Sequence, residues 1–90
     1  MGNKNALERY YHIDYCLYHD IHTLKEIVEY VNLQLTKDGL EPVSLRTVRK
    51  DICDIETIFS RFVVKERWLY DNKYHYFYDH GEKCIFTDNQ

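Results

Sequence analysis

Residues 44–59, SLRTVRKDICDIETIF, hold the clearest structural pattern in this 90-residue chain. Ser44 is a favourable N-cap residue, and it follows Pro42, which restrains the preceding turn. The apolar side chains after it recur every three or four residues, as a single helical stripe requires: Leu45, Val48, Ile52, Ile55 and Phe59. We therefore predict a helix from Leu45 to about Phe59 that packs along this stripe.

The first half of this helix gathers positive charge on its opposite side. At 100° per residue, Arg46 and Lys50 point away from the stripe, with Thr47 beside them and Arg49 on the flank. Cations near a helix N-terminus oppose the helix dipole, so helix propensity does not explain three cations and no acid between residues 44 and 50. An ordinary solvated face is the alternative interpretation. The acids that follow are expected beyond this charged half or along its edge: Asp51, Asp54 and Glu56.

Two helices are expected before this one. Residues 5–18 carry Ala6, Tyr10, Ile13 and Leu17 at helical spacing. Residues 19–22 form a short connector. Thr23 and Glu26 then make a capping box, and the second helix ends near Lys37 because Asp38–Gly39 supplies a stop.

After residue 60 the pattern changes to that of strands. Residues 62–64, 68–70 and 74–78 are rich in β-branched and aromatic side chains, and residues 71–73 are a turn signal. We predict a two-stranded hairpin. Three helices followed by a hairpin is the order of a winged helix-turn-helix, an α+β and mainly α fold. This domain is expected over residues 1–80. A polar tail over 81–90 follows, in which residues 84–86 offer a last packing contact.

The predicted hairpin, or wing, carries further cations. Lys65, Arg67 and Lys73, with Asn72 at the tip, are placed to reach a nucleic-acid backbone or minor groove. Edge strands also use lysine to discourage aggregation, which is the alternative explanation. The tyrosines that alternate over residues 74–78 are more typical of a sheet packed on helices than of a base-stacking platform.

The bulk composition sets limits on function. The net charge is −3 and the sequence pI about 5.9, whereas nucleic-acid binders usually carry a basic surface. Whether the chain can bind nucleic acid therefore depends on how its charges are distributed over the surface. No apolar run is long enough to span a bilayer, and the N-terminus lacks the apolar centre of a signal peptide. We expect a cytoplasmic protein without a membrane partner, with its cysteines reduced: Cys16, Cys53 and Cys84.

One group of potential metal ligands appears in the first helix. His12, Cys16 and His19 are spaced by four and three residues and are expected on the face opposite the apolar stripe. They are weak candidates for Zn²⁺ ligands, with His22 beyond the helix end. A polar outer face, part of a subunit contact, is the preferred interpretation. The chain has no Gly-rich phosphate loop, nucleophile elbow or HExxH motif, so neither an enzyme nor a cofactor is expected.

Several motifs resemble those of a known family. Residues 3–10, NKNALERY, and 13–17, IDYCL, resemble the opening of bacterial WYL-domain transcriptional regulators of the Bacteroides type. The similarity continues through residues 23–26, TLKE, and residues 43–52, VSLRTVRKDI. The latter is similar to the family's recognition-helix motif Val-Ser-Arg-Arg-Thr-Val-x-x-Asp-Ile, although Leu45 stands where the family often has Arg.

The resemblance implies an N-terminal winged helix that binds operator DNA, with Arg46, Thr47 and Asp51 in the motif's places. The 90 residues end before any WYL sensor domain, so the tail is expected to be a linker to one, unless the head stands alone. We expect sequence-specific binding of double-stranded DNA by a homodimer, with residues 44–59 in the major groove, Ser44 at their N-cap, and the hairpin on the flanking backbone. The alternatives are a protein-interaction module and, third, a metal-responsive regulator.

Overall fold

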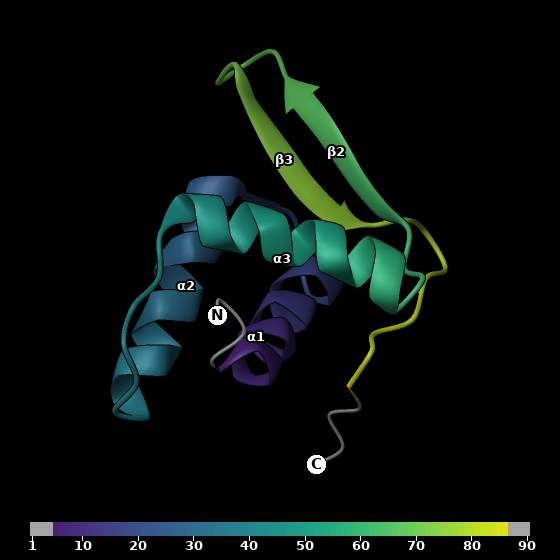
Figure 1. Ribbon diagram of the computed structural model, residues 1–90. Coiled ribbons are helices and arrows are strands. Elements are labelled where there is room, and N and C mark those ends of the chain that lie inside the picture. The colour runs from purple at the N-terminus through teal and green to yellow at the C-terminus, as the bar shows by residue number, and fades with distance from the viewer. Residues whose placement is uncertain (1–4, 87–90) are drawn as a thin grey trace.

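The computed structural model describes residues 5–86, which form a small α+β fold with three helices and a three-stranded antiparallel sheet (Figure 1). Its elements in chain order are α1 (Ala6–Tyr18), β1 (His22–Thr23), α2 (Leu24–Lys37), α3 (Leu45–Ile58), β2 (Val63–Trp68) and β3 (Lys73–Tyr78). The three helices and the hairpin lie where the sequence predicted them. None of the helices in the described part of the chain is long and apolar enough to cross a membrane.

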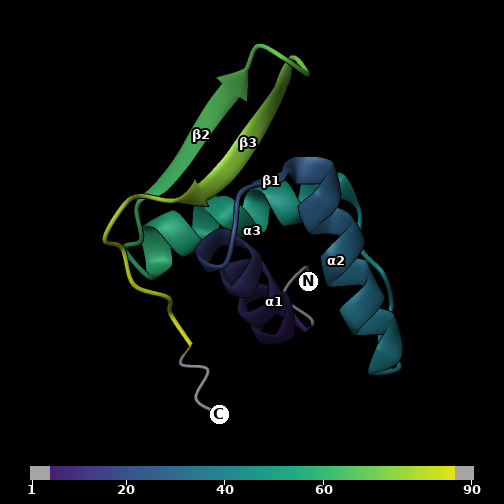
Figure 2. The same cartoon turned by 180° about the vertical axis from the view of Figure 1, so that it is seen from behind.

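The expectation of a two-stranded hairpin is wrong, because a third strand joins it. Within the connector that precedes α2, β1 pairs with β3 in the register His22↔Tyr76 and Thr23↔His75, which gives the strand order β1-β3-β2. Figure 2 shows this short strand beside β3. Two residues are too few to show the alternation that marks a strand in a sequence, so only the tertiary contact reveals it.

Local capping explains where the helices begin and end. The Thr23 hydroxyl accepts the Glu26 amide N–H (3.2 Å), and the Glu26 carboxylate accepts the Thr23 amide N–H (2.9 Å), which completes the predicted capping box. The Ser44 hydroxyl accepts the Thr47 amide N–H (3.2 Å) at the start of α3. Gly39 ends α2 at φ 78°, a conformation that suits glycine, while the Leu40 N–H reaches back to the Leu35 carbonyl (2.8 Å).

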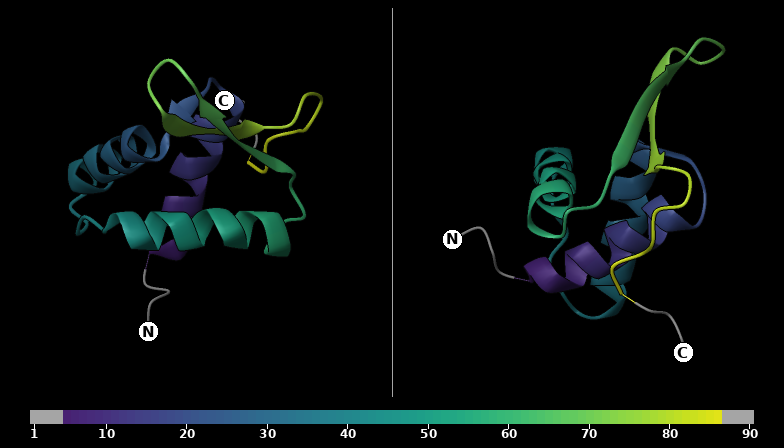
Figure 3. Two further views of the ribbon diagram at one scale, coloured as in Figure 1. Left: turned by 90° about the horizontal axis from the view of Figure 1, so that it is seen from above. Right: turned by 90° about the vertical axis from the view of Figure 1, so that its right-hand side faces the viewer.

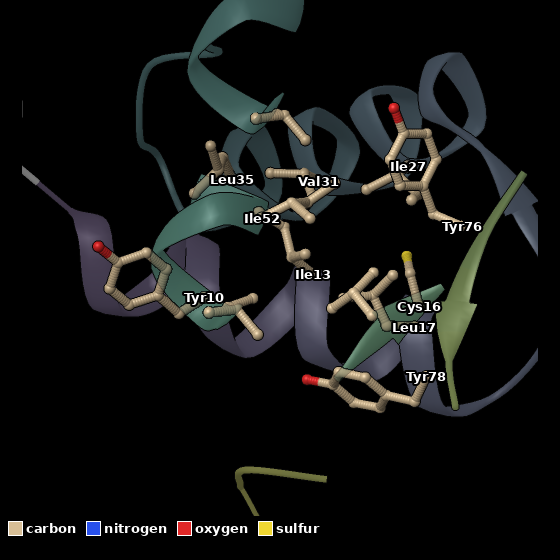
Figure 4. Packing of buried hydrophobic residues seen from close by; sticks show 13 residues of the cluster. Tyr10, Ile13, Cys16, Leu17, Ile27, Val31, Leu35, Ile52, Tyr76 and Tyr78 are labelled. Atoms are coloured by element: carbon tan, nitrogen blue, oxygen red, sulfur yellow. The ribbon is translucent and has the colours of Figure 1, made fainter. Parts of the chain in front are cut away.

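The core lies between the helices and the inner half of the sheet (Figure 4). Each helix contributes buried residues at three- and four-residue spacing, and the sheet adds three more: Ile13, Cys16, Leu17, Ile27, Val31, Leu35, Val48, Ile52, Ile55, Val63, Tyr76 and Tyr78. The first apolar position of α3 does not belong to this core. Leu45 is 41% exposed, so the buried part of the predicted stripe begins at Val48.

A buried ion pair joins α1 to α3. Arg9 donates from Nε to Oδ2 of Asp51 (2.5 Å) and from Nη2 to Oδ1 (3.1 Å), and both side chains are nearly inaccessible to solvent. The hydrogen bond to Asp51 raises the pKa of Arg9, although desolvation opposes this shift. The expectation that Asp51 lies at the edge of the charged face is therefore wrong. Asp51 projects between Val48 and Ile55 on the core side, where a carboxylate is tolerated because it is paired.

A second buried acid holds the C-terminal segment. Asp14 accepts the Tyr78 hydroxyl (2.6 Å) and the amide N–H groups of Ile85 (2.9 Å) and Phe86 (3.1 Å). Ile85 and Phe86 also pack against the core, which confirms the contact expected near residues 84–86. Residues 1–4 and 87–90, which include the start of the family-like opening and the end of the expected tail, lie outside the described residues.

Removing one partner of the Arg9–Asp51 pair should be costly. We expect Arg9→Met to lower the free energy of unfolding by about 3–5 kcal/mol, because Asp51 would keep a buried and unpaired charge. The double variant Arg9→Met/Asp51→Leu should recover most of that loss, since an apolar pair needs no compensation. Urea unfolding measures both variants against Lys25→Met, an exposed control on α2. An effect of Arg9→Met no larger than that of Lys25→Met would contradict a buried pair.

Candidate nucleic-acid interface

The outward face of α3 carries the cations that the sequence placed there. Arg46, Arg49 and Lys50 are exposed and Thr47 is half-buried, while Val48 and Ile52 on the other side lie in the core. Ser44 is exposed at the N-cap. The burial pattern of α3 therefore confirms the predicted orientation of these side chains. The first two turns of α3 present three guanidinium or ammonium groups to solvent.

A shallow groove runs along this half of α3. Its walls come from the α3 cations, the buried pair beneath them and three further α3 side chains: Arg9, Arg46, Thr47, Arg49, Lys50, Asp51, Cys53 and Asp54. Because Arg9 belongs to α1, two helices build the groove. A concave strip lined by cations has the shape and charge to receive a phosphate-bearing strand.

The remaining acid of the groove is also held by α1. The Tyr10 hydroxyl donates to Oδ2 of Asp54 (2.9 Å), and Lys50 Nζ lies 3.3 Å from the same oxygen. Burial, followed by the hydrogen bond to Asp54, raises the pKa of Tyr10 to about 12. Tyr10 is thus a hydrogen-bond donor at neutral pH. Arg9 neutralises Asp51, whereas Asp54 keeps its charge and offsets one cation, Lys50. The first half of α3 stays positive because its three cations outnumber this one acid.

The two faces of the hairpin differ. Residues opposite each other in the register share a face, so Lys65 and Arg67 lie on the face whose inner part, Tyr76 and Tyr78, packs on the helices. Lys73 lies on the other face, beside Trp68. The predicted hairpin cations therefore flank the hairpin on both sides and do not form one row.

The helix-facing row of the hairpin is ordered by local contacts. Lys65 Nζ lies 4.8 Å from the Tyr74 ring centroid, a cation–π distance. Arg67 donates from Nε and Nη2 to Oδ1 of Asn72 (2.9 and 2.6 Å). Since an amide oxygen carries no net charge, this contact orients Arg67 without neutralising it. Tyr76 and Tyr78 are buried, as expected for a sheet packed on helices, whereas Tyr74 is exposed.

Sequence reasoning missed the α1 side chains of this site. Arg9 and Tyr10 hold Asp51 and Asp54, whereas the sequence pattern predicts no partner for Arg9 and only a core position for Tyr10. A helical wheel contains the signal for Arg9, because this residue lies at the edge of the α1 apolar stripe. A charged residue at such an edge requires a partner on the facing helix.

The expected placement of the possible metal ligands on α1 is wrong for Cys16. Cys16 is 2% exposed and faces the core, where burial raises its pKa to about 12. His12 is half-buried with its pKa lowered by burial, and the ring of His19 lies 4.2 Å from that of Tyr15. Among residues 5–86, no three His, Cys, Asp or Glu side chains are placed to hold one metal ion. The helical wheel misplaced Cys16 because the other helices and the sheet cover more of the α1 surface than the apolar stripe indicates.

Thiol reactivity should separate the cysteines. In the native protein we expect a disulfide reagent such as DTNB to label exposed Cys53 rapidly and Cys16 only on unfolding, because Cys16 is buried and protonated. Cys53→Ser should remove the fast phase, whereas the matched variant Cys16→Ser should leave it intact. Loss of the fast phase in Cys16→Ser would place that thiol on the outer face of α1.

No family model, curated protein or solved structure matches this chain. The functional interpretation therefore depends on the α3 face, the groove beneath it and the hairpin.

Proposed function

We propose that this chain is a winged helix-turn-helix domain that binds double-stranded DNA in sequence-specific fashion, as the DNA-binding head of a bacterial transcriptional regulator. The carrying observation is the exposed cationic half of α3, Arg46, Arg49 and Lys50, on a helix whose nearby acids are held by α1. The order of three helices followed by a hairpin suits this fold, with β1 adding a short strand at the sheet edge. The motif resemblance to WYL-type regulators points the same way.

In this proposal α3 enters the major groove with its N-terminal turns toward the base edges. Arg46 is the best candidate for base contact, because its guanidinium matches two acceptors of guanine. Lys50 and Arg49 suit phosphate oxygens, and the backbone N–H groups at the Ser44 cap favour a phosphate as well. The hairpin then lies on the flanking duplex through Lys65, Arg67, Asn72 and Lys73.

The net charge of −3 lowers the expected affinity for DNA but does not change the charges at the α3 face. Long-range attraction to DNA is weak for an acidic protein, so a single head should bind weakly. Two heads on two half-sites raise the effective affinity without new contacts. We therefore propose a homodimer as the functional form.

The outer face of α1 is the surface best suited to a protein contact. Tyr11, Tyr15 and Tyr18 are each about half exposed and Leu7 is 61% exposed, and the Tyr15 ring stacks on Tyr30 at 5.6 Å. This face lies on the side of α1 away from the Arg9–Asp51 contact with α3. A partner here would leave the cationic face of α3 open. The same face favours the alternative function, a protein-interaction module, if DNA binding fails.

Charge reversal on α3 tests the DNA-binding proposal. We expect the chain to bind mixed-sequence duplex DNA with an affinity that falls steeply with salt. Arg46→Glu/Lys50→Glu should weaken binding at least ~100-fold and flatten the salt slope, since it removes two contacts. Fluorescence anisotropy measures both effects. The matched control Lys25→Glu/Lys37→Glu makes the same charge change on exposed positions of α2 and should cost far less. Equal losses of DNA affinity in the two variants would contradict the proposal that α3 contacts DNA.

Neutralising Asp54 tests the groove. Asp54 holds Lys50, so Asp54→Asn should free Lys50 for phosphate and strengthen DNA binding several-fold, with the largest gain at low salt. The variant keeps an acceptor for the Tyr10 hydroxyl, which preserves the helix contact. Unchanged or weaker binding in the anisotropy titration would show that Lys50 lies outside the DNA contact.

Substitution on α1 tests the dimer and separates it from the alternative function. Tyr15→Arg should convert a dimer to a monomer in sedimentation velocity, because it sets like charges against each other across a two-fold contact. DNA affinity should fall while the salt slope per protomer stays the same. Self-association that persists in Tyr15→Arg would exclude this face. Self-association through α1 without any DNA binding would favour the interaction module.

A further inference from the structure

The tip of the hairpin is the part of the sheet farthest from the helices (Figures 1 and 3). Residues 69–72 connect β2 to β3 there. Leu69 is 91% and Tyr70 78% exposed, which makes them the most exposed large hydrophobic residues of the described chain. A lone exposed leucine needs no explanation. An ordered turn that carries this leucine does need an explanation, because ordering a turn costs conformational entropy.

The turn is held on its own backbone and by two side chains. The Asn72 N–H donates to the Trp68 carbonyl (2.8 Å), with Asn72 at φ 57°, a left-handed conformation that asparagine tolerates. The Lys73 N–H donates to Oδ1 of Asp71 (3.1 Å). Arg67 clamps the Asn72 side chain from the preceding strand. These contacts hold the turn that carries Leu69, and all of them come from the hairpin itself.

The underside of the tip is a stacked aromatic layer. The Trp68 ring lies 4.0 Å from that of His75, at an interplanar angle of 17°. His75 Nε2–H donates to Asp71 (2.9 Å), and Trp68 Nε1–H donates to Glu66 (3.2 Å). The two acids of the tip thus bind side chains of the hairpin itself. The pKa of Asp71 is lowered, because the hydrogen bonds from His75 and the Lys73 amide outweigh its desolvation.

Two cations flank the tip, one on each face of the hairpin, beside the carboxylates of Glu66 and Asp71. Arg67 meets a neutral amide oxygen, and exposed Lys73 lies on the opposite face of the hairpin. A pre-ordered apolar side chain between two cations fits a narrow groove with phosphates on both edges. The minor groove of B-DNA, about 6 Å wide, has that form. It is too narrow for a helix, and a turn that presents one leucine can enter it.

We propose that Leu69, with Tyr70 beside it, is an apolar wedge that enters the minor groove next to the α3 site and opens a base step, while Arg67 and Lys73 contact the flanking phosphates. The inference rests on the proposed DNA-binding function and adds a mechanism to it. Wedges of this kind kink the duplex toward the major groove. DNA kinked in this way would curve around α3. Flexible pyrimidine–purine steps would then be preferred where no side chain reads a base.

Ligase-mediated circularisation of a mixed-sequence fragment of about 120 base pairs measures bending without knowledge of the operator. Such a fragment is shorter than the DNA persistence length of about 150 base pairs, so it closes slowly unless bent. We expect the wild-type chain to accelerate closure at least tenfold. Leu69→Ala/Tyr70→Ala should abolish the acceleration but keep the salt slope of binding, because no phosphate contact is removed. The matched control Leu33→Ala/Phe62→Ala shortens two exposed apolar residues away from the tip and should behave as wild type.

The outcomes distinguish the wedge from the function on which it rests. If the wild-type chain binds DNA and the tip variant still accelerates closure, the wedge is wrong and DNA binding stands. If the tip variant loses self-association in sedimentation velocity and closure is unchanged, the tip is a protein contact and the wedge is again overturned. If the wild-type chain does not bind duplex DNA at low salt, both proposals fail. Urea midpoints equal to wild type show that the exposed substitutions leave the fold intact.

Discussion

The ion pair between Arg9 and Asp51 is the contact on which the orientation of α3 depends. Its two groups meet through two hydrogen bonds across the α1–α3 interface, nearly out of contact with solvent. A buried pair has strict geometry, because a small displacement leaves two desolvated charges unsatisfied. Apolar packing of Val48 and Ile52 would tolerate some rotation of α3 about its axis. The pair does not, and it fixes Arg46 and Lys50 on the solvent side.

The first helix organises the rest of the fold through polar side chains at the margins of its apolar stripe. Arg9 and Tyr10 bind the two α3 acids, while Asp14 binds Tyr78 of β3 and the backbone near Phe86. A 90-residue domain has a thin core, so directional contacts matter more than in a large protein. They also specify relative positions that a small set of aliphatic side chains leaves loose.

The sequence was informative where local rules apply and silent where long-range partners decide. The caps at Thr23 and Ser44 gave the helix starts, and the helical wheel gave the exposure of the α3 cations. The wheel assigns a direction to Asp51 but cannot reveal that Arg9, 42 residues away, neutralises it. The wheel therefore predicts an exposed acid where the structure has a buried one. The strand at 22–23 and the burial of Cys16 likewise depend on contacts with distant parts of the chain. The turn at the hairpin tip contains no glycine, so its geometry could not be predicted from turn residues.

On the proposed function, the distribution of charge and apolar surface separates two tasks. The acidic total weakens general attraction to DNA, so binding must come from a few well-placed groups. The α3 face supplies polar groups suited to base edges and phosphates, and it stays cationic because Arg9 neutralises Asp51 and Asp54 offsets only one of its three cations. The hairpin supplies an apolar tip whose acids are held by Trp68 and His75. Both elements thus hold acids in contacts within the chain, Asp51 in a buried ion pair and Asp71 against His75, and both place cations where they can reach a duplex.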